Sequence, residues 1–310
     1  MINYLLKKLS ILLASLFAVV SLTFFLTHTI PGDPFSDEEV IPEEILSALK
    51  RHYGLDKPLY VQYGQYFKNL LQGNLGVSFK YQGRTANAII GEGFPISLTL
   101  GLEALTIAIP VGILLGSVAA FRRGRWQDQS MMLIAVVGIS VPSFILATLL
   151  QYLFAMQLDW LPVARWGSFA QSILPALSLG ALPTAMIARL TRSNMVEVLQ
   201  QDYILTAKAK GLSSFQLVYR HALRNALVPV VSYLGPLSAN VLTGSFVVEK
   251  IFGIPGLGQW FVLSVTNRDY TLIMSLTIFY SAILMLSVFV VDIVYSLMDP
   301  RIKYGKVRNS

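Results

Sequence analysis

The sequence predicts an all-α integral membrane protein with six transmembrane helices. Hydrophobic residues make up 54% of its 310 residues and charged residues only 13%, with a mean hydropathy of +0.59. A soluble domain of this length carries more charge and fewer apolar residues. Six apolar stretches are long enough to cross a bilayer as helices that rise about 1.5 Å per residue. They are approximately residues 9–30, 97–121, 130–156, 172–190, 226–248 and 272–298.

The first stretch is predicted to be a retained helix. Lys7 and Lys8 precede an apolar run, as basic residues do in a secretory signal. The run is longer than a signal needs, however, and it ends in His28-Thr29-Ile30-Pro31 without a small-x-small cleavage site.

A polar segment follows at residues 31–96, and its charges exclude it from the lipid. One short helix is predicted from Pro42 to Tyr53 and a second from Leu59 to Leu71. Two interpretations stand. The segment caps the outer mouth of the bundle or contacts an external partner, or it is a passive tether.

The net charge of +7 is explained by membrane topology. An even number of spans puts both chain ends on one side. Of the 24 lysines and arginines, 15 lie in the segments on that side, and most of the others lie in the long segment 31–96, which carries little weight for orientation. The positive-inside rule therefore predicts cytoplasmic termini, and no nucleic-acid partner is needed to explain the charge.

Three residues inside the stretches are candidates for a path through the bundle or for helix packing. Glu103 lies about two turns into the second stretch, and Asp292 lies toward the end of the sixth. Ionisable groups at membrane depth face the bundle interior or a cavity. Asp292 is better explained by a structural role, whereas Glu103 fits both roles equally. Pro142 frees a backbone carbonyl in the third stretch, which predicts a kinked, closely packed helix.

A turn-rich region follows the fifth stretch. Pro255, Gly256 and Gly258 predict a tight turn, and residues 259–265 have the pattern of a short helix. We expect an external re-entrant or surface element that closes an outer gate. An ordinary loop is the alternative.

The most informative segment, residues 197–229, is polar and mostly basic and lies between the fourth and fifth stretches. Strong helix formers fill residues 197–210, and Gly211 follows where a helix end requires a left-handed residue. Ser213 and Gln216 have the spacing of a capping box that begins a second helix. The two helices are expected to meet at a sharp corner.

This corner offers apolar and cationic side chains in alternation. The apolar ones are Tyr203, Leu205, Ala207 and Leu212, and the cations are Lys208, Lys210, Arg220 and Arg224. Such a surface inserts small and aromatic groups into a groove while cations hold its rim, which predicts docking to a cytoplasmic partner. A solvated loop between helices is the alternative.

Nothing in the sequence indicates an enzyme or a metal protein. Cysteine is absent, and the three histidines, His28, His52 and His221, are scattered. No G-x-x-x-x-G-K-[ST] phosphate loop, H-E-x-x-H or G-x-S-x-G motif occurs. The chain is therefore expected to be non-catalytic and to bind neither ATP nor a metal.

Segment 197–229 resembles the EAA loop of permeases of ATP-binding-cassette (ABC) importers, which has the form Glu-Ala-Ala, three residues, Gly, nine residues, Ile-x-Leu-Pro. Ala207, Gly211 and Leu223 match this motif. The positions that depart from it, as in the peptide-type branch, are Leu205, Thr206, His221 and Arg224, so no contact is assigned to a glutamate here. Further fragments are similar to that branch: Pro31-Gly32-Asp33-Pro34, TRSNMVEVL at 191–199, HALRNALVP at 221–229, IPGLGQ at 254–259, Arg268-Asp269-Tyr270 and VDIVYSLMDPRI at 291–302.

The chain is most similar to B-type permease subunits of oligopeptide importers. The resemblance implies a type I importer permease fold with a cytoplasmic coupling helix and an external segment after the first helix. It implies a first helix with the external segment (residues 1–93), a core transmembrane domain (94–302) and a cytoplasmic tail (303–310). The implied contacts to the ATPase are Tyr203, Thr206, Ala207, Lys208, Lys210, Gly211 and Leu212.

The same resemblance implies the partners. A second, homologous C-type permease would lie beside this chain in the lipid of the bacterial cytoplasmic (inner) membrane, with two cytoplasmic ABC ATPases that bind ATP and Mg and an external peptide-binding protein. The implied substrate is a short peptide, with nickel or another small solute as the alternative within the family. A channel or ion-coupled transporter is a separate hypothesis, but such a transporter is expected to show an internal repeat and ion ligands near the midplane. No convincing repeat is visible, and Glu103 is the single candidate ligand.

Overall fold

The structure, a computed structural model, describes residues 2–29, 43–52, 54–213 and 216–298. These residues are mainly helical, and the β-structure among them is one isolated bridge between Val77 and Thr85. The α-helices are α1 (Ile2–Thr29), α2 (Glu43–His52), α3 (Leu59–Leu71), α4 (Ala86–Phe121), α5 (Trp126–Ser140), α6 (Ser143–Leu150), α7 (Phe169–Val198), α8 (Asp202–Ala209), α10 (Leu223–Ala226), α11 (Val228–Leu242), α12 (Phe246–Phe252), α13 (Leu257–Thr266) and α14 (Tyr270–Met298). Two wider π-type helices are η1 (Gln151–Gln157) and η2 (Leu217–Ala222). The predicted tail, 303–310, and the motif at 31–34 lie outside the described residues.

Four unbroken helices are long and apolar enough to cross a membrane: Leu6–Thr29 within α1, all of α4, all of α7, and Tyr270–Val294 within α14. Three pairs of consecutive segments meet the same test jointly but bend at a short break: α5 with α6 and η1, η2 and α10 with α11, and α12 with α13. The described residues therefore offer between four and seven spans. The predicted number, six, lies in this range, and the all-helical membrane class is confirmed.

The third stretch, predicted as one helix over residues 130–156, is broken. α5 ends at Ser140 and α6 begins at Ser143, with an angle of 106° between the two arms. Pro142 lies at the break, and Val141 before it has extended backbone angles of φ −81° and ψ 117°. Proline disfavours helical geometry in the preceding residue and has no N–H to donate. The helix therefore ends at this position and the chain changes direction, where the sequence had predicted only a kink.

Other predicted boundaries also move. The second span begins at Ala86 instead of residue 97, since α4 continues through Pro95, and the proposed domain boundary at 93/94 lies inside this helix. The fifth span ends at Leu242 instead of residue 248, because the chain turns at Gly244 with a left-handed φ of +96°. The two short helices of the external segment are confirmed as α2 and α3.

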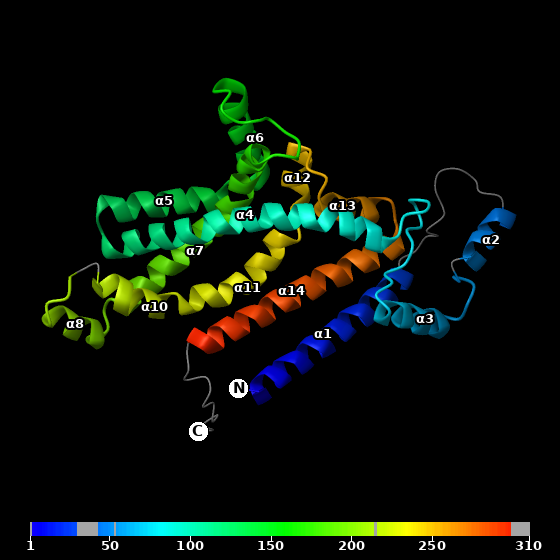
Figure 1. The fold of residues 1–310 in the computed structure, drawn as a ribbon, viewed down its shortest axis with the longest axis horizontal. Coiled ribbons are helices and arrows are strands. Elements are labelled where there is room, and N and C mark those ends of the chain that lie inside the picture. The colour runs from blue at the N-terminus through cyan, green and yellow to red at the C-terminus, as the bar shows by residue number, and fades with distance from the viewer. Residues whose placement is uncertain (1, 30–42, 53, 214–215, 299–310) are drawn as a thin grey trace.

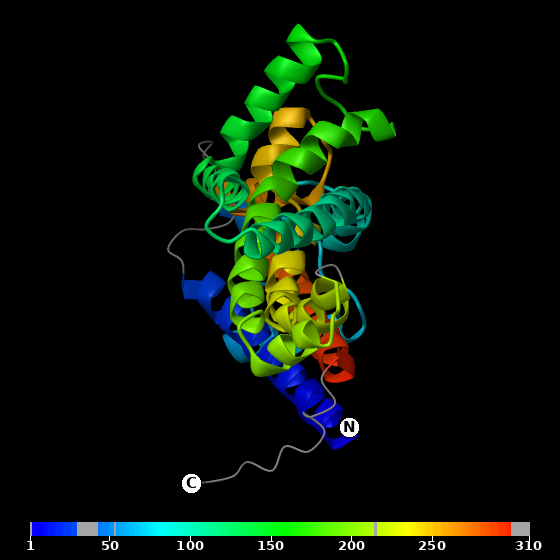
Figure 2. The same cartoon turned by 90° about the vertical axis from the view of Figure 1, so that its left-hand side faces the viewer.

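The two ends of the bundle carry different elements. On the left of Figure 1 lie α8, the turn between α4 and α5 and the C-terminal end of α14, whereas α2 and α3 lie at the right. α6 and η1 project away from the other helices in both Figure 1 and Figure 2. The external segment and the segment that carries α8 are thus separated by the length of the bundle.

α4 and α7 form the most extensive helix contact, and glycines let them approach closely. A Cβ added at Gly112 would lie 2.8 Å from Ile187 Cβ, and one added at Gly116 would lie 2.6 Å from Thr191 Cβ. In lipid, close packing through small residues replaces the hydrophobic effect as a source of helix association. α4 and α7 therefore form a tightly packed pair.

An ion pair joins the first and last spans. Lys8 Nζ lies 2.9 Å from Asp292 Oδ2, and α1 packs along α14. Charged groups near the ends of membrane helices find such partners because an isolated charge is expensive there. Asp292 therefore ties two helices together.

Candidate functional site

The segment predicted to couple the protein to a partner is not a single helix over residues 197–210. α7 ends at Val198, a turn follows, and α8 begins at Asp202. Gln201, at the N-cap of α8, has extended angles of φ −75° and ψ 147°. Strong helix formers on both sides concealed this break, because propensity does not reveal a turn that tertiary packing sets.

Gly211 ends α8 as predicted. Its φ is +83°, and its N–H donates to the carbonyl of Lys208 at 3.0 Å. No described residue lies within 4 Å of a Cβ added here, so the left-handed backbone, and not a lack of space, requires glycine. The predicted capping box is also present, since Ser213 N–H donates to Gln216 Oε1 at 3.1 Å and Gln216 N–H donates to Ser213 Oγ at 3.3 Å.

α8 has a buried face and an exposed face. Ile204 and Ala207, three residues apart, are 3% and 8% exposed. Ile204 packs in a cluster with Ala120, Met195, Leu217, Ala222 and Ala226. Ala207 was expected to enter a groove of the partner, but it is buried against this protein. Its side chain therefore helps to pack α8 against the bundle. The exposed residues of α8 and of the corner after it include Asp202, Tyr203, Leu205, Thr206, Lys208, Ala209, Lys210 and Gly211. Leu212 is partly exposed, and the side chain of Arg220 is outside the described part.

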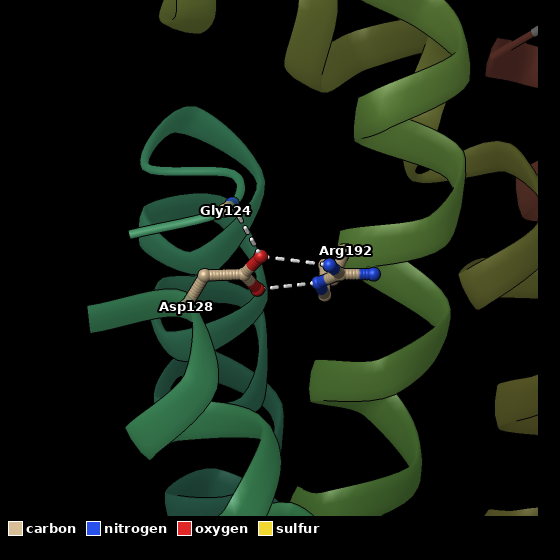
Figure 3. Close-up of polar contacts among 3 residues, drawn as sticks. All are labelled: Gly124, Asp128 and Arg192. Carbon is tan, nitrogen blue, oxygen red and sulfur yellow. Dashed lines mark hydrogen bonds and ion pairs between the residues drawn. The ribbon is translucent and has the colours of Figure 1, made fainter. Parts of the chain in front are cut away.

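A two-pronged ion pair lies near this end of the bundle (Figure 3). Nε and Nη2 of Arg192, in α7, donate to Oδ1 and Oδ2 of Asp128, in α5, at 2.6 and 2.8 Å. The Gly124 N–H also donates to Oδ2, at 3.0 Å, and Asp128 is 4% exposed. Such pairing fixes orientation as well as charge, so the α4–α5 turn is held against the last part of α7. An acid placed shortly after a cluster of arginines, at the start of an apolar stretch, is the signal that could have revealed this pair.

The turn around Pro255 is the bend of a helical hairpin. α12 is followed by Gly253 at φ +63°, and α13 leaves at 108° to α12. Gly256 is the N-cap of α13 and Gly258 lies in its first turn. A bent pair of this kind is either a broken span or a re-entrant loop, and the short helix expected over residues 259–265 is confirmed as part of α13.

A fully buried carboxylate, Glu249 of α12, holds this hairpin to α4. Glu249 Oε1 accepts a 2.7 Å hydrogen bond from Ser97 Oγ, and Oε2 accepts a 2.9 Å bond from Gly258 N–H. Ser97 Oγ in turn accepts the Leu257 N–H at 2.8 Å. The first N–H groups of a helix have no partner inside it, and side chains of other elements satisfy two of them here. Glu249 was missed because the predicted fifth span ended at residue 248.

Glycines make room for this carboxylate. A Cβ at Gly256 would lie 2.5 Å from Glu249 Cδ, and a Cβ at Gly258 would lie 2.9 Å from Glu249 Oε2. A Cβ at Gly244, after α11, would meet Glu249 Oε1 as well. The glycines predicted to form a gate are therefore required by the close approach of a side chain, in addition to the turn.

The external segment is attached to the same region. Ser78 Oγ donates to the carboxylate of Asp269, which lies just before α14 and is fully buried. Tyr81 meets Trp260 of α13 edge to face, with ring centroids 5.1 Å apart, and its hydroxyl lies 3.0 Å from Asn267 Nδ2. This part of the segment therefore packs against the hairpin and is not a passive tether.

A cavity of about 330 Å³ lies between α1, α3 and α14, with Phe24, His28, Tyr66 and Thr271 in its wall. Tyr66 Oη is buried and has no hydrogen-bond partner among the described residues. Burial raises the pKa of Tyr66 above its ordinary value, so the hydroxyl remains a donor at neutral pH. The described residues of the wall include no Asp, Glu, Lys or Arg, which suits a neutral polar group.

The three candidate residues within the spans are not brought together by any described contact. Glu103 lies in the middle of α4, and its Oε2 is buried without a hydrogen-bond partner among the described residues. Pro142 is exposed at the α5–α6 corner, and Asp292 pairs with Lys8. The described residues also contain no group of three His, Cys, Asp or Glu side chains placed to hold a metal.

Two family models match nearly the whole chain. The N-terminal model of binding-protein-dependent transport system membrane components matches residues 1–101. The model described as "Binding-protein-dependent transport system inner membrane component" matches residues 112–304. The chain belongs to this permease family. It is therefore a membrane permease subunit, as the resemblance predicted.

Relatives of this permease carry the names of peptide transport systems. The dipeptide transport system permease protein DppB of Bacillus subtilis is 49% identical over 99% of both chains. DppB of Lactococcus lactis is 43% identical, and the oligopeptide transport system permease protein OppB of Salmonella typhimurium is 40% identical, each over 98% of this chain and 100% of its own. A solved amino acid ABC transporter aligns with a TM-score of 0.49 at 17% identity, covering 69% of this chain and 94% of that one. The similarity to the dipeptide and oligopeptide branch is confirmed.

Proposed function

We propose that this permease is the membrane subunit of an ATP-driven importer that passes short peptides across the cytoplasmic membrane. The observation that carries the proposal is the 49% identity with a dipeptide permease over 99% of both chains. Nickel and other small solutes are not favoured, because the relatives above are named for peptides. A self-sufficient ion-coupled transporter is not favoured either, since the family is that of binding-protein-dependent systems.

The proposed assembly contains a second, homologous permease, two cytoplasmic ABC ATPases and an external peptide-binding protein. ATP and Mg bind the ATPases, because this chain has no phosphate loop. Both termini and α8 are proposed to be cytoplasmic, since the segments at that end of the bundle contain most of the lysines and arginines.

The coupling surface is proposed to be the outward side of α8 and the corner after it. Tyr203 and Leu212 would enter a groove of the ATPase, Thr206 would lie beside them, and Lys208 and Lys210 would contact its rim. Ala207 and Gly211 act differently. Ala207 seats α8 on the bundle through its buried face, and Gly211 sets the direction of the chain after the helix.

The α12–α13 hairpin is proposed to form the outer gate, with Pro255, Gly256 and Gly258 at its bend. Support comes from Glu249, which binds the hairpin to α4, and from the external segment, which packs against α13. Glu103 is proposed to line the translocation path, since its carboxylate has an unpartnered buried oxygen in the middle of a span.

Reconstitution in vesicles tests this function. The complete complex, with binding protein outside and ATP inside, is expected to accumulate a labelled dipeptide, and the permease alone is expected to accumulate nothing. Nickel is offered in a parallel assay with the same vesicles. Dipeptide accumulation by the permease alone under an ion gradient, or ATP-driven uptake of nickel without uptake of dipeptide, would refute the proposal.

A further inference from the structure

A cavity of about 410 Å³ opens between α5 and α7 beside the Asp128–Arg192 pair. Its lining residues are Met132, Ala135, Val136, Arg189, Arg192 and Ser193. The residues from α5 are apolar, and those from α7 are two arginines and a serine. The cavity therefore has an apolar wall that faces a cationic, hydrogen-bonding wall.

The described residues neutralise the charge of the cationic wall only in part, because Asp128 pairs with one of its two arginines. Arg192 uses Nε and Nη2 to bind Asp128, and its remaining nitrogen points away from that carboxylate (Figure 3). The Asp128 carboxylate accepts two hydrogen bonds from Arg192 and one from the Gly124 N–H, and none from Arg189. Arg189 is exposed, and no hydrogen bond or ion pair of its side chain is found with any described residue. Two arginines thus line one cavity, and among the described residues one of them, Arg192, has an acidic partner.

The residues at the start of α5 are typical of the depth of lipid headgroups. Arg192 in the cavity wall binds Asp128, which follows the α4–α5 turn, where Arg122, Arg123 and Arg125 are exposed and Trp126 is 70% exposed. Exposed tryptophan beside arginine at the end of an apolar helix is typical of the membrane–water interface. The apolar wall from α5 and the facing cationic wall from α7 are complementary to a molecule that carries both an apolar and an anionic part.

We propose that this cavity binds the headgroup phosphate of an anionic phospholipid. Arg189, the remaining nitrogen of Arg192 and the Ser193 hydroxyl would donate to the phosphate oxygens, a geometry for which guanidinium groups are well suited. Met132 and Val136 would contact the glycerol and the first acyl carbons. A soluble phosphate has the same oxyanion but nothing to place against the apolar wall, so a lipid fits better.

The site is independent of the proposed transport function. It requires only that this end of the bundle lies at a lipid surface, whichever side of the membrane that is. Asp128 has a positioning role here, because its two bonds to Arg192 fix a guanidinium group that belongs to the cavity wall.

The test measures lipid retained by the assembled transporter. The complex is placed in vesicles of phosphatidylcholine mixed with phosphatidylglycerol and extracted with mild detergent, and the two bound lipids are quantified by mass spectrometry. Arg189→Gln removes one cation without breaking the Asp128–Arg192 pair, and it is expected to reduce retained phosphatidylglycerol about five-fold, the effect of one basic residue at a membrane surface. Arg189→Lys, which keeps the charge, is expected to restore most of the retention.

The matched control is Arg125→Gln, which removes an exposed arginine of the α4–α5 turn that does not line the cavity. This variant is expected to retain phosphatidylglycerol like the parent. Equal retention by Arg189→Gln and the parent, or an equal loss in Arg189→Gln and Arg125→Gln, overturns the proposal. Displacement of phosphatidylglycerol by inorganic phosphate alone also overturns it, in favour of a soluble phosphate ligand.

Discussion

Ser97 of α4 donates a 2.7 Å hydrogen bond to Glu249 of α12, which lies 152 residues further along the chain. The same two side chains accept the first two N–H groups of α13. All three helices therefore meet at one buried carboxylate. Because each of these bonds is enclosed by protein, we expect the hairpin and the adjoining part of α4 to move as one body.

Replacing this carboxylate by an amide tests that expectation. In Glu249→Gln, the amide NH2 faces either Gly258 N–H or the Ser97 hydroxyl, so a buried donor loses its acceptor at a cost of about 1–3 kcal/mol. We expect a lower unfolding temperature of the purified permease and loss of most peptide uptake. The control is Glu92→Gln, because Glu92 forms an exposed ion pair with Arg84 that contributes little. An unfolding temperature of Glu249→Gln equal to that of the parent would contradict the anchoring role.

A second prediction concerns the contact between α4 and α7. In Gly116→Ala the new methyl group would lie 2.6 Å from Thr191 Cβ, so the helices must separate, which costs about 1–3 kcal/mol. We expect a lower unfolding temperature in detergent. Gly91→Ala, on the same helix, has nothing within 4 Å and should be tolerated. If both variants unfold at the same temperature, the packing of α4 on α7 is looser than the structure shows.

The left-handed residue after α8 gives a third prediction. Gly211→Val imposes strain of about 1–2 kcal/mol or more on a backbone with φ +83°, which redirects the chain that leaves α8. Membrane insertion should be unchanged, whereas stimulation of ATPase activity by the binding protein should be lost in the reconstituted complex. The control is Gly73→Val, which has a φ of +75° and equally open space but lies in the external segment. Normal stimulation in Gly211→Val would argue against a coupling role.

The buried face of α8 gives a fourth prediction. Ala207→Asp places a carboxylate on this face beside Ile204, where an unpaired charge is strongly disfavoured, so α8 should detach from the bundle. Gln200→Asp adds the same charge at an exposed position in the turn before α8, outside the proposed coupling surface. We expect ATP-driven uptake to be abolished in the first variant and largely kept in the second. Equal loss in both would mean that the negative charge, and not the seating of α8, is responsible.

Local patterns were predicted well because the chemistry that determines them is local. Gly211 and the Ser213–Gln216 capping box depend on a few neighbouring residues, and both are present in the structure. The break at Pro142 is also a local effect, but its size is not, because the packing around a proline decides whether a helix kinks or turns a corner.

The buried carboxylates were not predicted, because their partners are distant in the sequence. Asp128 binds an arginine 64 residues away, and Glu249 binds a serine 152 residues away. Hydropathy marks such residues only as charges near the ends of apolar stretches. The long-range contacts that satisfy them, and the glycines that admit them, become visible only when the helices are placed beside one another.

The length of α4 has a mechanical consequence. Its 36 residues correspond to about 54 Å, against roughly 30 Å for the hydrocarbon core of a bilayer. Ser97, in its first half, contacts the hairpin, and Gly116, near its other end, packs on α7, so one continuous helix touches both the hairpin and the helix that leads into α8. A rigid helix of this length converts a small tilt at one end into a sideways displacement at the other, without requiring any loop between them to refold.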